Sequence, residues 1–267
     1  SVFTPTADTT DSQNTLTLAA DSYTDLALNN GPGATTANYA VDTASPAAFQ
    51  VTTVASTGGT AVATHLNSTN TGVSVTVPLA ADATLVNGTI QLRMKVGDNA
   101  YADIGSAATI TTADTTQAVL ITDDNIEGAA NYAENGVLTF TAVITDSAGN
   151  ATTGTASATT LTVDQAAPTV DTFTMSDTSL ITGDTATVTL TFSEAVTGFN
   201  SDDDITEQSG TLGTMTSNNN IAWTGTFTPS ANTSDSTNTL SLAITYTDVA
   251  GNPGPTATTA NYVVDTA

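Results

Sequence analysis

The chain of 267 residues has 26 acidic residues against two basic ones, a formal net charge of −24 at pH 7 and a pI near 4.1. So negative a surface repels nucleic acid and anionic lipid, which excludes phosphate-binding functions and favours divalent cations as small partners. The lack of cysteine excludes disulfides and thiol chemistry. Since no apolar run approaches the roughly 18 to 20 residues that cross a bilayer, we expect no membrane insertion.

The two ends of the chain repeat one another. Residues 1–44 contain FTPTADTTDSQNTLTLA and ATTANYAVDTA, and residues 227–267 contain FTPSANTSDSTNTLSLA and ATTANYVVDTA. A more divergent copy lies between them, where ITDSAGN and LTVDQAAP parallel YTDVAGN and YVVDTA. Such self-similarity indicates tandem domains. We predict the C-terminal part of one repeat, truncated or completed by a partner, followed by two complete units, with bounds 1–44, 45–166 and 167–267.

Hydrophobic residues alternate with polar ones along several stretches of the chain, which is the period of half-buried strands. In chain order these stretches are 73–79, 90–96, 138–144, 185–192 and 239–246. Trp223 follows the same alternation, and we interpret it as a core residue. Many such strands between Gly, Pro, Asn and Asp turns, with no helical period, predict an all-β chain. We expect tandem immunoglobulin-like antiparallel β-sandwich domains arranged end to end as a rod.

Aspartates collect at strand ends and turns, whereas the outward strand faces carry threonine and serine. In an immunoglobulin-like sandwich, the turn between the last two strands and the turn after the second strand both lie beside the incoming linker. Carboxylates gathered there need a neutralising cation, and calcium takes six to eight oxygen ligands without histidine or cysteine. The candidate metal ligands are Asp42, Asp82 and Asp146 at the first junction, and Asp164, Glu194, Asp202, Asp203 and Asp248 at the second.

A different reading of these acids needs no metal. Asp and Asn side chains also accept hydrogen bonds from the backbone of their own turns, and this alone explains many of their positions. Neither an EF-hand loop nor a glycine-rich calcium-binding nonapeptide occurs in the chain. Both explanations therefore stay open at this point.

Candidate catalytic residues are few. The single histidine, His65, falls in a predicted loop without a partner motif for a catalytic triad. The two basic residues, Arg93 and Lys95, lie on the outward face of the predicted strand 90–96, where local acids can pair with them. No glycine-rich phosphate loop and no cleft-forming insertion around a carboxylate pair is present. We therefore predict that the chain is not an enzyme.

The TDxAGN turns, the VDTA and VDQAAP linkers and the stretch TGDTATVTLTFSEAVTGFNSDDD resemble the bacterial immunoglobulin-like repeats of large adhesins exported by type I secretion, of the calcium-dependent RTX and Bap-like kind. The resemblance covers essentially the whole chain. It implies an extracellular stalk on the bacterial surface, stiffened by calcium at junctions where linker aspartates and acidic turns meet, which serves adhesion or biofilm formation. The sequence departs from the pattern at Gln165, at 26–28 and at Asn30, so the turn of the first unit is the weakest candidate site.

Two other functions remain open. One is a self-assembling structural subunit of an extracellular filament, sheath or surface layer, because the few strands of residues 1–44 would have unpaired edges unless further chain or another copy completes them. The other is a glycan-binding module, which the aromatic content of 5% disfavours. The expected partners are neighbouring repeats of the same chain and, for a filament, other copies of it.

Overall fold

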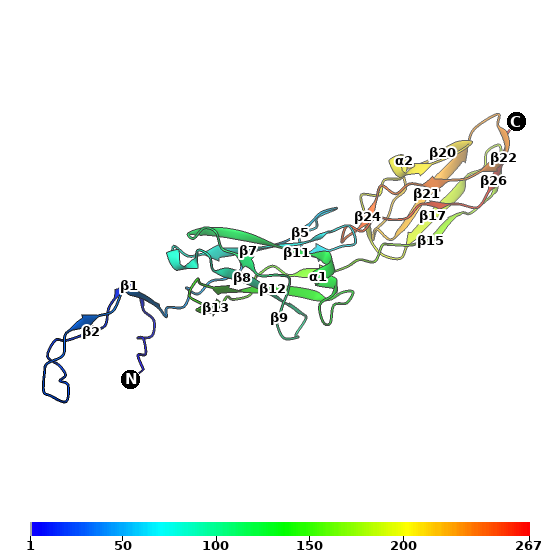
Figure 1. The fold of residues 1–267 in the computed structure, drawn as a ribbon. Coiled ribbons are helices and arrows are strands. Elements are labelled where there is room, and N and C mark those ends of the chain that lie inside the picture. Colours follow the sequence, from blue (N-terminus) through cyan, green and yellow to red (C-terminus); the bar gives the residue numbers. More distant parts are fainter. Residues whose placement is uncertain (1) are drawn as a thin grey trace.

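The computed structural model describes residues 2–267, which fold almost entirely as β-strands (Figure 1). The chain is elongated, and its two termini lie at opposite ends. We refer to residues 2–44 as the first unit, 45–166 as the middle unit and 167–267 as the third unit. Buried hydrophobic residues form two separate cores, one between Val51 and Val163 and one between Phe173 and Val264. The all-β fold class with sandwiches arranged end to end is confirmed.

The first unit consists of two short antiparallel ladders. One joins β1 (Thr10–Asn14) to β4 (Tyr39–Asp42), and the other joins β2 (Thr17–Leu18) to β3 (Ala34–Thr35). Within residues 2–44 every hydrophobic side chain is at least partly exposed. This unit therefore has strands without a packed core.

The middle unit is a sandwich of two sheets. Alternate residues of its long strands point inward, so that Val73, Val75 and Val77 are fully buried while threonine and serine between them face outward. His65 begins a short strand and is half-buried, so the predicted loop at this position is wrong. One sheet contains β5 (Thr53–Thr57), β7 (Gly72–Leu79) and β11 (Thr115–Thr122). The other contains β6 (His65–Leu66), β8 (Thr89–Val96), β9 (Ala102–Asp103), β10 (Ala108–Thr109), β12 (Val137–Thr145), β13 (Ala151–Thr153) and β14 (Leu161–Val163), and η1 (Ala83–Leu85) and α1 (Asp123–Glu127) are short helices.

The third unit packs a four-stranded sheet against shorter ladders around an aromatic core. Trp223 is half-buried, and its ring meets that of Phe199 edge to face with centroids 4.8 Å apart, in agreement with the predicted core role. The four-stranded sheet contains β15 (Val170–Met175), β17 (Ala186–Phe192), β20 (Gly210–Leu212) and β21 (Ala222–Pro229). The other ladders contain β16 (Ser179–Ile181), β18 (Val196–Thr197), β19 (Ile205–Thr206), β22 (Ser234–Asn238), β23 (Ser241–Leu242), β24 (Thr247–Asp248), β25 (Ala257–Thr258) and β26 (Tyr262–Asp265), and α2 (Ser201–Asp204) is a single helical turn.

The predicted strand at 239–246 is interrupted. Leu240, Leu242 and Tyr246 are buried as the alternation requires, but Ile244 is 60% exposed because the chain bends there. The backbone N–H of Ala243 donates to the carbonyl of Asp204 at 2.8 Å, in register with the β19–β23 ladder, and the strand bends immediately after it. The period of two therefore identified three of the four inward residues, and it was wrong for Ile244 because of the bend.

The repeated positions Leu18 and Leu242 provide a matched test of where the packed core ends. Leu242→Ala should lower the free energy of unfolding of the third unit by about 2 to 5 kcal/mol, because it leaves a cavity in a core. Leu18→Ala should change stability by under about 0.5 kcal/mol, because that side chain is 48% exposed. Calorimetry of the whole chain measures both; a lowered transition temperature for Leu18→Ala would show that the first unit has a core.

Candidate metal centre

Three carboxylates from separate segments meet where the middle unit joins the third unit. Asp164 lies in the linker after β14, Glu194 follows β17, and Asp248 ends β24. One carboxylate oxygen from each lies within 4.8 Å of the other two. Among residues 2–267, no other group of three acidic or histidine side chains has this spacing. The structure thus brings together three of the residues that the sequence analysis placed at this junction.

The turn that contains Asp248 fixes its carboxylate, which is fully buried. Oδ1 accepts hydrogen bonds from the backbone N–H groups of Gly251 at 2.7 Å and Asn252 at 2.9 Å, and Oδ2 accepts one from Asn252 Nδ2 at 2.8 Å. Gly251 has a φ of +98°, a conformation that residues with a side chain rarely adopt. The TDVAGN sequence therefore holds a buried carboxylate in a defined position.

Asn252 also connects this turn to the linker. Its Nδ2 donates to the backbone carbonyl of Asp164 at 2.9 Å and approaches Oδ1 of the same residue at 3.2 Å. One buried amide thus positions two of the three clustered carboxylates.

Negative charge at this junction is not balanced by any basic side chain of the third unit, since residues 167–267 contain no lysine or arginine. Burial, followed by the charges of Asp248 and Glu134, raises the pKa of Asp164. Burial and the charges of Asp248, Asp164 and Glu134 likewise raise the pKa of Glu194. A bound divalent cation would remove this repulsion, and a set of oxygen donors without nitrogen or sulfur is what calcium prefers. Asp164, Glu194 and Asp248 are the residues that would hold it.

Glu134, which lies in the turn before β12, was not predicted from the sequence. Its carboxylate oxygens accept the backbone N–H of Gln165 at 3.1 and 3.2 Å. The amide of Gln165 donates in turn to Glu127 at 3.0 Å. The middle unit therefore contributes a fourth acidic side chain to the junction, from the end opposite to its own TDSAGN turn. The sequence around Glu134 carries no motif; its place at the junction follows only from how the middle and third units stack.

Asp202 and Asp203 are not members of the group. Oδ2 of Asp202 accepts the hydroxyl of Thr214 at 3.0 Å, and Oδ2 of Asp203 accepts Nδ2 of Asn200 at 2.7 Å. Asn200 also caps α2 by accepting the backbone N–H of Asp202 at 3.2 Å. These two acids serve their local turn, as the alternative without metal describes.

The first junction has the same turn without the carboxylate cluster. Oδ1 of Asp146 accepts the backbone N–H of Asn150 at 2.8 Å, and Asn150 Nδ2 donates to the backbone carbonyl of Asp42 at 3.2 Å. Asp82 instead caps η1 by accepting the backbone N–H and hydroxyl of Thr84 at 2.9 and 2.7 Å. Within residues 2–267, Asp42, Asp82 and Asp146 do not form a group with the spacing seen at the second junction.

Direct hydrogen bonds also join the middle unit to the third unit. Asn67, which is fully buried, donates from Nδ2 to the carbonyl of Ala250 at 2.7 Å. The backbone N–H of Ser68 donates to Oδ1 of Asn252 at 2.8 Å. A Cβ on Gly251 would lie 2.8 Å from Asn67 Nδ2, so the two loops are in close contact. This second set of interactions fixes the junction without an ion.

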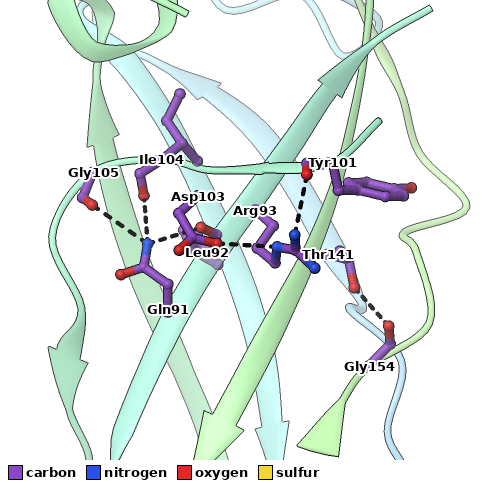
Figure 2. Close-up of polar contacts among 9 residues, drawn as sticks. All are labelled: Gln91, Leu92, Arg93, Tyr101, Asp103, Ile104, Gly105, Thr141 and Gly154. Carbon is purple, nitrogen blue, oxygen red and sulfur yellow. Dashed lines mark hydrogen bonds and ion pairs between the residues drawn. The ribbon is translucent and has the colours of Figure 1, made fainter. Parts of the chain in front are cut away.

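Both basic side chains are engaged within the middle unit, and Figure 2 shows the contacts of Arg93. Arg93 pairs with Asp103 at 3.0 Å, and its Nη2 donates to the carbonyl of Tyr101 at 3.1 Å. Nζ of Lys95 lies over the ring of Tyr101, 5.5 Å from its centroid. These contacts hold the segment around β9 against β8, which agrees with the local pairing expected from the sequence.

Replacing Glu194 tests the centre. Glu194→Gln should raise the melting temperature of the metal-free protein, because it removes one of several mutually repelling charges, and should weaken the stabilisation by calcium, because it removes a ligand. Glu207→Gln, a similar change in the same unit outside the group, is the control. Thermal melting in chelator and in calcium measures both effects. An equal calcium response in both variants would contradict the assignment.

Replacing Asn252 tests the hydrogen bonds across the junction. In Asn252→Ala the backbone N–H of Ser68 loses its acceptor and should exchange with solvent at least about tenfold faster, which corresponds to about 1.4 kcal/mol. Asn150→Ala removes the same amide at the first junction and should leave Ser68 unchanged. Hydrogen exchange followed by NMR distinguishes them, and unaltered exchange of Ser68 in Asn252→Ala would refute the interpretation.

Part of the chain is similar to a known protein family. Residues 164–264 match a family model described as a bacterial Ig-like domain. A solved structure of the FN1–FN3 domains of chicken CNTN1 is similar over 88% of this chain and 73% of that chain, with 13% sequence identity and a TM-score of 0.32. No curated protein matches the sequence. Among residues 2–267, no helix is long and apolar enough to cross a membrane. The segment that provides Asp164, Glu194 and Asp248 is thus similar to bacterial Ig-like domains.

Proposed function

We propose that this chain is a stalk segment of a bacterial cell-surface protein, which spaces other parts of that protein by stacking immunoglobulin-like units end to end. Support comes from the bacterial Ig-like domain at 164–264 and from the elongated arrangement of the units in Figure 1. The observation that carries the proposal is the second junction, where acidic groups and hydrogen bonds from two units converge. Direct polar contacts between two stacked units suit a module that holds its neighbours at a fixed spacing.

Calcium is the proposed cofactor of this junction. Glu134 belongs to the middle unit, Asp164 to the linker, and Glu194 and Asp248 to the third unit, so an ion among them would add a further connection between the two units. Without an ion, their mutual repulsion opposes the stacking that the Asn67 and Ser68 hydrogen bonds favour. Calcium would therefore stiffen the rod.

The proposed location is extracellular, and the proposed role is structural, without catalysis. The partners are neighbouring repeats of the same chain, and adhesion or biofilm formation is the proposed activity of the whole surface protein. A self-assembling filament, sheath or surface-layer subunit is the second candidate. The observation that favours it is the set of exposed apolar side chains in the first unit, such as Leu16 and Leu18.

Removal of calcium tests the proposed function. Calcium should raise the melting temperature, by the equivalent of about 2.7 kcal/mol at one hundred times the dissociation constant. It should also narrow the range of end-to-end lengths in small-angle X-ray scattering, because the junction becomes stiffer, and chelator should reverse both effects. In the double variant Asp164→Asn, Glu194→Gln, calcium and chelator should change neither the melting temperature nor the range of end-to-end lengths. If chelator changes neither property of the original chain and elemental analysis finds no bound metal, calcium stiffening is refuted.

A further inference from the structure

One sheet of the middle unit ends in a long and regular edge strand. β11 pairs with β7 over all eight of its residues, from Thr115 to Thr122, without a shift in register. The strand order of this sheet is β11–β7–β5, so β11 has a neighbouring strand on one side only. β11 is therefore the edge of the sheet along its full length.

The backbone of β11 leaves hydrogen-bonding groups on that free side. Successive residues of an antiparallel strand direct their N–H and C=O groups to opposite sides, so half of the groups of β11 point away from β7. Among residues 2–267, no backbone hydrogen bond outside the β7–β11 ladder involves residues 115–122. The side chain of Gln117 turns to the carbonyl of Thr109 at 3.0 Å. A row of donors and acceptors is thus available to another strand.

The other edge strands of the middle and third units are shorter than β11. β6, β10, β16 and β20 have only two or three residues, and β5 has five. β15 and β22 each contain an aspartate and a shift in register. Short length, bulges and charges are the usual devices that keep an edge from pairing. β11 has none of them, since its sequence TTQAVLIT contains no charge, no proline and no bulge.

An apolar side chain of β11 lies in solvent beside this edge. Leu120 is 71% exposed, and its partner on β7 is Ser74, which is too small to cover it. Thr116 and Ala118, which lie on the same face of the strand, are also exposed. The outer face of the strand is therefore uncharged, and apolar or β-branched side chains of an added strand could pack across from it.

The charges at the ends of β11 discriminate between partners. Asp114 precedes the strand, and Asp123 and Asp124 follow it. Two copies of β11 paired antiparallel about a twofold axis would bring Asp114 of each chain beside Asp123 and Asp124 of the other, and each chain has a net charge of −24. Lysine or arginine at the ends of an added strand would meet opposite charges instead. The charge pattern thus favours a basic partner over a second copy of the chain.

We propose that β11 is a docking edge for an extended polypeptide segment with an uncharged centre rich in β-branched residues and with lysine or arginine at both ends. The segment adds a fourth strand to the β11–β7–β5 sheet. Its main-chain hydrogen bonds provide affinity, whereas the contact with Leu120 and the charges at both ends provide specificity. This inference goes beyond the proposed stalk function and does not depend on calcium. It gives the rod a lateral partner on the side of one of its units.

A synthetic peptide of alternating threonine and valine residues with two lysines at each end is the probe. In the full chain without peptide, alternate N–H groups between Thr115 and Thr122 should exchange rapidly with solvent, because they point away from β7. The lysine peptide should slow the exchange of this set at least about tenfold, because these groups become hydrogen-bonded. A peptide with glutamate in place of lysine should slow none of them. Hydrogen exchange followed by NMR measures both.

Two variants test the separate sources of specificity. Asp114→Asn with Asp124→Asn should weaken binding of the lysine peptide at least about threefold at low salt, because two attractions are lost. Asp171→Asn with Asp177→Asn removes the same charge from the third unit and should bind as the original chain does. Leu120→Lys should abolish binding, because it repels the peptide, and should leave the melting temperature unchanged, because the side chain is exposed.

Three results would overturn the proposal. They are equal protection by the lysine and glutamate peptides, protection of another edge strand in place of β11, and unchanged exchange of β11 at millimolar lysine peptide. Slow exchange of the outward N–H groups in the chain alone, together with a doubled mass in solution, would overturn it in favour of a second copy.

Discussion

The side-chain amide of Asn252 connects three groups on which the junction depends: the buried carboxylate of Asp248, the backbone carbonyl of the linker residue Asp164 and the backbone N–H of Ser68 in the middle unit. A fully buried carboxylate is costly unless several donors satisfy it, and here two backbone N–H groups and one amide do so. The turn therefore fixes the orientation of the third unit relative to the chain that enters it.

The same turn occurs in each unit, but its surroundings differ. Asp25 and Asn29 form it in the first unit, where the side-chain hydrogen bond from Asn29 lowers the pKa of Asp25. At the second junction the corresponding residue, Asp248, lies beside the linker residue Asp164, whose pKa is raised by burial and by the neighbouring carboxylates. A single local motif can thus be a solvated turn or part of a charge cluster, and the neighbouring unit decides which.

The amino-acid sequence predicted the interior of each sandwich well, because alternation along a strand directly reports which side chains face the core. Val73, Val75 and Val77 are an example, and the repeat of TDVAGN also led to the grouping of Asp164, Glu194 and Asp248. Glu134 and Asn67 were missed because contacts between stacked units come from loops, whose positions follow no period. Asp202 and Asp203 were misplaced because a helical turn capped by Asn200 directs them to Thr214 and to Asn200 itself.

The contact between the middle and third units has a consequence for sequence variation in such rods. Asn67 binds the carbonyl of Ala250, and the group that Ser68 offers to Asn252 is its backbone N–H. Almost every residue type carries these backbone groups, so the side chains at 68 and 250 can change without loss of the hydrogen bonds. Units of different composition can then form the same junction, provided that one keeps a buried asparagine at the position of Asn67 and the next keeps one at the position of Asn252.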